Sequence, residues 1–135
     1  MKKILCFLLL LNTFLLGEQM QIQLLFNGKE LRVILEDNEA SKQFYNVLPM
    51  ELEFSDFMKK EKIAHLPKVL NAKGSSAYKP QIGDLFYYVP WGNIGIFYEL
   101  QNASNDLVYL GKVQGDLEAL KAQKADFKMK IVKLK

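Results

Sequence analysis

Short segments with period-two alternation constrain this chain more than any other feature of its sequence. Residues 22–26 and 31–35 largely alternate between apolar and polar side chains, and Asn27-Gly28 lies between them. Alternating residues of an extended chain point to opposite faces of a sheet. An Asn-Gly pair between two such runs favours a tight turn, because both residues tolerate positive φ. The sequence therefore predicts a hairpin near its start.

The same reasoning predicts six further strands and two helices. The strands are expected at 50–56, 63–66, 85–89, 94–100, 107–113 and 127–134. Asp37-Asn38 can cap a helix that Pro49 ends, and Asp116 can cap a second helix over 117–125. Eight strands are enough to close a barrel, which also removes exposed edges. We predict a mainly β fold, a closed eight-stranded barrel with two short helices, and a two-sheet sandwich is the alternative.

The first residues have the pattern of a secretory signal peptide. Lys2-Lys3 precede an apolar run, Ile4–Leu16, that only Asn12 and Thr13 interrupt. This run is shorter than the roughly 20 apolar residues of a spanning helix. We expect a signal peptide at 1–17, a single domain at 18–135 and a periplasmic or secreted location. A buried N-terminal strand or helix is the alternative.

The predicted leader carries the only cysteine, Cys6, so the remaining chain has no thiol and no disulfide. Removal of Lys2 and Lys3 lowers the formal net charge from +3 to +1. Six lysines crowd the C-terminal end, where apolar residues alternate with them: Lys121, Lys124, Lys128, Lys130, Lys133 and Lys135. The wet face of a half-buried strand has this pattern, and weak contact with an anionic surface is the alternative. Nucleic acid is not an expected partner.

Several short motifs, taken in order, resemble those of the small bacterial cyclophilin-like domain family. They are Asn27–Lys29, Leu35–Asn38, Ala64–Pro67, Tyr78–Pro80, Gly83–Tyr88, Ile96–Tyr98 and Leu110–Val113. The resemblance covers about residues 20 to 134. It implies a closed eight-stranded barrel with two helices, the fold that the strand pattern also predicts.

The resemblance also raises the question of prolyl isomerisation. Authentic cyclophilins use an arginine that donates hydrogen bonds as the peptide bond loses its double-bond character. The only arginine here is Arg32, which we expect on the face of its strand opposite Leu31, Val33 and Leu35. No residue is therefore carried over as catalytic, and a fold can be shared without its activity. An isomerase that acts without the usual arginine is the alternative.

Aromatic residues provide the candidate binding site. Seven of them fall between Tyr78 and Tyr98, and core packing explains only some, because neighbours on a strand face opposite sides. We expect Tyr78, Tyr87 and Trp91 to line an apolar groove beside the loop 68–82, with Phe97 and His65 as further ligand-binding candidates. A lone histidine is also compatible with a structural role, and it has no metal-ligand spacing.

Two residues nearby are predicted to have structural roles. Asp84 follows Gly83 and can accept backbone N–H groups in a turn, and Gly95 indicates a bulge or a close backbone approach. From these residues we expect an exported domain that binds a peptide or a small molecule, with no metal and no cofactor.

Overall fold

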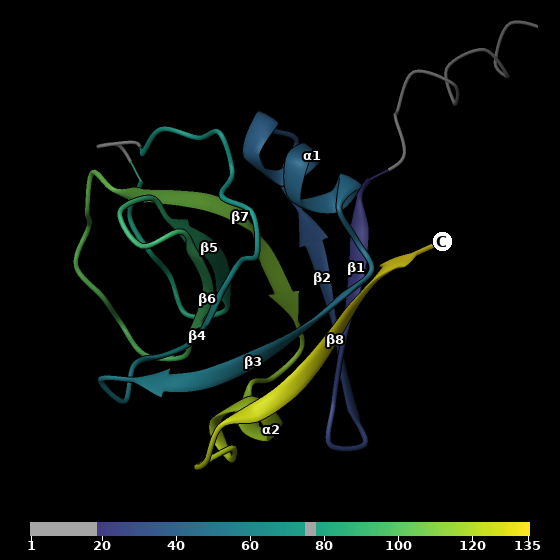
Figure 1. The fold of residues 1–135 in the computed structure, drawn as a ribbon. Coiled ribbons are helices and arrows are strands. Elements are labelled where there is room, and N and C mark those ends of the chain that lie inside the picture. The colour runs from purple at the N-terminus through teal and green to yellow at the C-terminus, as the bar shows by residue number, and fades with distance from the viewer. Residues whose placement is uncertain (1–18, 75–77) are drawn as a thin grey trace, which may run out of the picture.

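The computed structural model describes residues 19–74 and 78–135, and the predicted signal peptide lies outside the described residues. Eight antiparallel strands form a closed barrel in the order β1-β2-β7-β5-β6-β4-β3-β8 (Figure 1). The strands are β1 (Gln21–Phe26), β2 (Lys29–Leu35), β3 (Met50–Phe57), β4 (Glu61–His65), β5 (Asp84–Tyr88), β6 (Asn93–Phe97), β7 (Leu107–Gln114) and β8 (Phe127–Leu134). All eight fall within residues 21–134, so a fragment spanning 18–135 contains the whole barrel. The predicted fold class is confirmed.

The first hairpin forms where the sequence predicts it. Phe26 pairs with Lys29, and the two residues between them have positive φ, 47° at Asn27 and 73° at Gly28. Strand β8 then closes the barrel by pairing with both β1 and β3. Ile22, Leu24 and their inward-facing counterparts are almost fully buried. Burial of each such side chain contributes about 1.5–3 kcal/mol.

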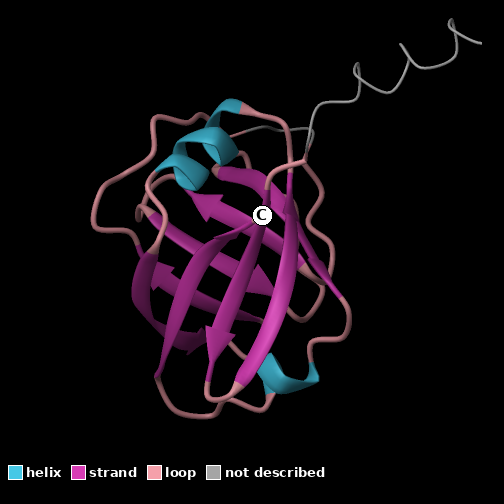
Figure 2. Cartoon of the chain, turned by 90° about the vertical axis from the view of Figure 1, so that its right-hand side faces the viewer, coloured by secondary structure: helices cyan, strands magenta, loops and turns pink. Residues whose placement is uncertain are grey.

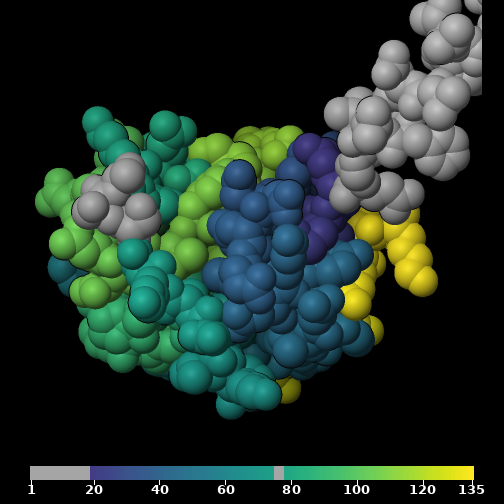
Figure 3. All heavy atoms as spheres, turned by 90° about the horizontal axis from the view of Figure 1, so that it is seen from above, coloured from purple at the N-terminus to yellow at the C-terminus, as the bar shows by residue number. Residues whose placement is uncertain are grey.

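The two helices, α1 (Glu39–Asn46) and α2 (Glu118–Lys121), lie at opposite ends of the barrel (Figure 2). The side chain of Asn38 caps α1 by accepting a hydrogen bond from the Ser41 N–H at 2.8 Å. Figure 3 looks onto this end and shows α1 lying across it. Two hydrogen bonds between the Gln43 side chain and the backbone of Asn71 connect the helix to the loop between β4 and β5.

Three elements have other bounds than predicted. The sixth strand was expected to reach Leu100 but ends at Phe97, because the N–H groups of Tyr98 and Glu99 donate to the Lys60 carbonyl instead of a sheet partner. The second helix was expected over 117–125 but has one turn, anchored by the buried Leu120. The fourth strand was expected at 63–66, but β4 begins at Glu61, and Lys62 within it points into the barrel and is 2% exposed. Its Nζ donates to Asp56 and to the Gln123 carbonyl.

One half of the barrel wall is buried on both sides. Along β8 and β1, buried and more exposed residues alternate, whereas β4, β5 and β6 are buried over almost their whole length. Leu85 and Tyr87 of β5 belong to the barrel core, while Phe86 belongs to a second apolar cluster with Ile63, Phe97 and Leu107. Because neighbouring residues on a strand face opposite sides, this second cluster lies on the outside of the barrel.

Candidate functional site

A groove runs over the outer apolar cluster, and we call it the outer groove. It has a volume of about 360 Å³. Strands β4, β5 and β6, the end of β3, the start of β7 and the loop before β7 supply its lining: Phe57, Glu61, Phe86, Tyr88, Trp91, Asn93, Phe97, Gln101, Asn102, Ala103, Ser104 and Leu107. Ligand sites in proteins usually occupy about 300–1,000 Å³. The outer groove is thus large enough for one or two side chains of a partner.

The floor of the outer groove depends on Gly95. A Cβ at this position would lie 2.4 Å from Cζ of Phe86, so only glycine leaves room for that ring against β6. The Phe86 ring stacks on Phe97 with a centroid distance of 4.0 Å and an interplanar angle of 16°. The close approach predicted at Gly95 is confirmed, and its consequence is a flat aromatic floor.

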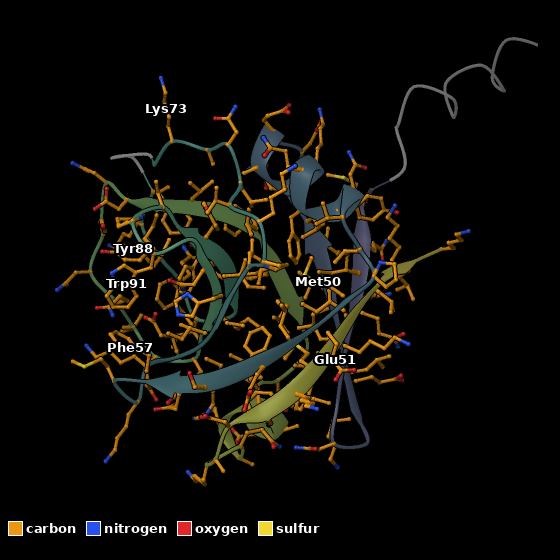
Figure 4. The ribbon with its side chains drawn as sticks, viewed as in Figure 1. Met50, Glu51, Phe57, Lys73, Tyr88 and Trp91 are labelled. Carbon is orange, nitrogen blue, oxygen red and sulfur yellow. The ribbon has the colours of Figure 1, made fainter. Side chains whose placement is uncertain are left out.

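The rim of the outer groove is a set of three aromatic rings. Trp91 lies in the turn between β5 and β6, with Phe57 on one side and Tyr88 on the other (Figure 4). Both contacts are edge-to-face, with centroid distances of 5.5 Å to Phe57 and 5.3 Å to Tyr88. Such pairs contribute about 0.5–1.5 kcal/mol each beyond their buried area. They hold the indole in place while 52% of the residue stays exposed.

Two buried polar side chains stand among these aromatic residues. Asn93 is 1% exposed, and its Nδ2 donates to the Ile94 carbonyl at 3.3 Å. Its Oδ1 is the one buried side-chain polar atom in the described residues without a hydrogen-bond partner. Buried polar atoms are normally satisfied, so this oxygen points to a partner that the protein itself does not supply.

Glu61, the second buried polar residue, is 9% exposed and pairs with Phe97 across β4 and β6. Burial raises the pKa of the Glu61 carboxyl, and the negative charge of Asp56 adds to the rise. A side-chain hydrogen bond with Gln101 and the positive charge of Lys60 act in the opposite direction on this pKa. A carboxylate that has lost water binds a donor or a cation more strongly than an exposed one.

The structure brings two of the five predicted ligand-binding residues together. Trp91 and Phe97 both line the outer groove, at its rim and on its floor. Tyr87 does not: it faces the barrel core, is 1% exposed, and its hydroxyl accepts a hydrogen bond from the Leu70 N–H at 3.1 Å. The expected groove of Tyr78, Tyr87 and Trp91 is therefore replaced by one built on Phe86, Tyr88 and Phe97.

The other two predicted residues have separate surroundings. The Tyr78 hydroxyl donates to Asp84 at 2.8 Å, and its ring packs against Tyr109. Asp84 also accepts from the Gln81 N–H and pairs with Lys112 at 2.7 Å, which confirms its predicted role in a turn. His65 is exposed at the end of β4, opposite Asn93 in the register, and is not among the groove-lining residues.

Sequence reasoning missed the polar residues of the outer groove. Glu61 belongs to a charged stretch that reads as a turn, and Gln101 reaches the groove only because the chain leaves the sheet after Phe97. The only available signal was Asn93 beside Trp91-Gly92, an amide in a turn that is otherwise apolar.

The C-terminal lysines lie on a face of mixed charge. The register places Lys128 opposite Glu53 and Lys130 opposite Glu51, and all four side chains are exposed. The Lys133 ammonium lies over the Tyr45 ring at 4.7 Å. Opposite charges directly across two strands stabilise the sheet and reduce the net field of the surface.

Within 19–74 and 78–135, no helix has the length and the apolar character of a membrane span. In the same part of the chain, three or more histidine, cysteine, aspartate or glutamate side chains do not gather in a group that could hold a metal ion.

Comparisons with known proteins agree with the observed fold. The solution structure of the hypothetical protein AF2241 from Archaeoglobus fulgidus superposes with a TM-score of 0.64 at 17% identity, over 88% of this chain and 98% of that one. No curated protein matches the chain. The model of the cyclophilin-like family matches residues 24–132, nearly the whole barrel. The chain therefore belongs to the cyclophilin-like family.

Proposed function

We propose that this protein is an exported binding module that holds a peptide or a small molecule in the outer groove. The unpartnered Oδ1 of Asn93, set in an aromatic groove, carries the proposal. Aromatic residues with a few fixed polar groups are the usual lining of ligand sites.

Export is supported by the sequence of the first seventeen residues. Lys2-Lys3 and the apolar run to Leu16 suit a cleaved leader. Expression of the full chain in a Gram-negative host, followed by cell fractionation and mass spectrometry, tests this. We expect a periplasmic or extracellular product that begins near Glu18. An intact chain in the cytoplasm would contradict the proposal.

Binding fits the outer groove better than catalysis does. Isomerisation in this fold needs a donor placed at the peptide nitrogen, and the groove lining includes no arginine, lysine or histidine. The single arginine, Arg32, is exposed on β2, where it pairs with Gln23 and Gln114. A standard proline-peptide isomerisation assay on residues 18–135 should show no acceleration. Catalysis that disappears in Trp91→Ala would favour the isomerase alternative instead.

The fluorescence of Trp91 provides a direct binding assay, because it is the only tryptophan. Residues 18–135 are titrated with acetylated and amidated tripeptides that carry each natural side chain at the centre. We expect saturable spectral changes for a subset of these peptides. If no peptide changes the spectrum and none gives heat of binding by calorimetry, the ligand is not a peptide of this kind.

Two matched substitutions locate the binding site. Ala103→Leu narrows the outer groove without changing charge, whereas Ala125→Leu places the same side chain on an exposed position between α2 and β8. Binding should weaken about tenfold in Ala103→Leu, as expected when an occupied pocket loses volume, and stay unchanged in Ala125→Leu. Equal affinities in both variants would place the ligand elsewhere.

A further inference from the structure

The two buried polar side chains of the outer groove, Asn93 and Glu61, offer hydrogen-bond acceptors. Asn93 has an unpartnered Oδ1, while one N–H of its Nδ2 donates to the Ile94 carbonyl. Glu61 presents a carboxylate, which is acceptor-only when ionised. A ligand that satisfies these two side chains must therefore bring donors.

The charge of Glu61 in the outer groove is only partly compensated, by Lys60 and Gln101. Glu61 has no ion-pair partner within 4.0 Å among the residues that the structure describes, although the cluster at the barrel end pairs Asp56 with Lys62 at 3.0 Å. A buried carboxylate without a cation is costly to the folded state, and a bound cation offsets that cost. The surrounding aromatic rings add to this preference, because the face of a ring attracts positive charge.

Arginine is the natural side chain that combines these properties. Its guanidinium carries five donors in a planar fork, pairs with carboxylates through two hydrogen bonds, and stacks on aromatic rings. The volume of about 360 Å³ is small for a ligand site, near the lower end of the usual range of about 300–1,000 Å³. It suits one long side chain with a short length of its backbone.

We propose that the outer groove binds an arginine side chain of a partner peptide, with Glu61 and Asn93 as acceptors and Trp91 as a stacking surface. This inference rests on the proposed binding function and specifies its ligand. The ammonium of lysine fits less well, because a point charge cannot make the paired contact or stack. A neutral apolar side chain would leave both acceptors unpaired.

The test compares three peptides that differ in one group. Acetylated, amidated Ala-Ala-Xaa-Ala-Ala is titrated into residues 18–135 with arginine, lysine or citrulline at Xaa, and binding is followed by Trp91 fluorescence and calorimetry. Citrulline keeps the shape of arginine and removes its charge. We expect the arginine peptide to bind about tenfold or more tightly than the citrulline peptide, since hydrogen bonds between charged groups are about twice as strong as neutral ones.

A second experiment removes the charge of Glu61 from the protein. Glu61→Gln retains an acceptor for Gln101 and removes the carboxylate, so the preference for arginine over citrulline should disappear. Glu53→Gln removes an exposed glutamate of β3, outside the groove lining, and should retain the preference. Circular dichroism of both variants confirms that the barrel is folded.

A pH series gives an independent readout. The charged and polar neighbours of Glu61 are Asp56, Lys60, Tyr98 and Gln101. Affinity for the arginine peptide should rise as pH increases through the raised pKa of Glu61, and the profile should be flat in Glu61→Gln. The parent and the Glu61→Gln variant both carry His65→Gln in this series, so that titration of an exposed histidine on the same face of the sheet does not contribute to the pH profile.

The outcomes separate this inference from the proposed function. If the citrulline peptide binds as tightly as the arginine peptide, the inference is wrong while groove binding stands. If binding prefers arginine but Glu61→Gln does not change the preference, the cation lies elsewhere and the inference is also wrong. If none of the peptides binds, the peptide ligand of the proposed function fails together with it.

Discussion

Gly95→Ala should damage the floor of the outer groove, and the size of the effect can be worked from the structure. The added Cβ would lie 2.4 Å and 2.7 Å from two carbons of the Phe86 ring and 3.1 Å from Cγ2 of Ile63. Carbon atoms pack best at about 3.5–4.0 Å, so the ring must retreat by about 1 Å. Phe97, stacked on that ring at 4.0 Å, blocks the retreat.

Two opposing effects set the expected stability change. Overpacking of this kind costs about 1–3 kcal/mol. Alanine also lowers the conformational entropy of the unfolded chain relative to glycine, which stabilises the folded protein by about 0.4–1 kcal/mol. The free energy of unfolding of Gly95→Ala should therefore fall by about 1–2 kcal/mol, measured by urea denaturation of residues 18–135 with far-UV circular dichroism.

A double-mutant cycle assigns the loss to the ring. Phe86→Leu removes the two carbons nearest the new methyl group, so adding Gly95→Ala to it should cost about 0.5 kcal/mol or less. Residues in contact show coupling energies of about 0.5–3 kcal/mol in such cycles. If Gly95→Ala is as stable as the parent, or costs the same in both backgrounds, Phe86 does not lie on β6 as described.

Three further predictions concern Tyr87 and Asp84, which lie outside the outer groove, and Glu61, which carries the charge within it. Tyr87→Phe leaves the Leu70 N–H unpaired, so the free energy of unfolding measured in urea should fall by about 1–3 kcal/mol, with peptide binding unchanged. An unchanged free energy of unfolding would show that this hydrogen bond does not stabilise the fold. Asp84→Asn removes the charge that pairs with Lys112 and should destabilise by about 1–3 kcal/mol, again without weakening binding; weaker binding would connect this cluster to the groove. Burial raises the pKa of Glu61 above its ordinary value of 4.5, so the folded protein holds that proton more tightly than the unfolded chain. The resulting stability is present below pH 4.5 and is lost as pH rises through the raised pKa, so Glu61→Gln should gain stability relative to the parent in that window; parallel pH profiles would contradict this.

Local signals in the sequence were sufficient for most of the barrel. The Asn27-Gly28 turn and the Asn38 cap each depend on a few adjacent residues, and both form as predicted. Such features are set by backbone φ preferences and side-chain hydrogen bonds, which do not need the rest of the fold. Eight strands are enough to close a barrel, and the pairing of β8 with both β1 and β3 closes this one.

The candidate site was predicted less well, because it depends on which face of each strand turns outward. β5 is buried from Asp84 to Tyr87 on both faces, so its sequence has no polar alternation that would separate the core from the groove. Only the register with β6, which opposes Tyr87 to Ile94 and Phe86 to Gly95, places Tyr87 inside. Glu61 and Gln101 are forty residues apart in sequence, and only the tertiary fold brings them to one site.

Closure of the barrel has a consequence for recognition. Strands β5 and β6, which form the floor of the outer groove, are paired on both sides along nearly their whole length, so the groove offers no free edge to which a partner could add a strand. Many peptide-binding domains gain affinity from such main-chain pairing and read side chains only secondarily. Here a partner must be recognised by its side chains, with its own backbone left in water. Binding should then tolerate N-methylation of the partner's backbone, and it should not depend strictly on the direction in which the partner's chain runs.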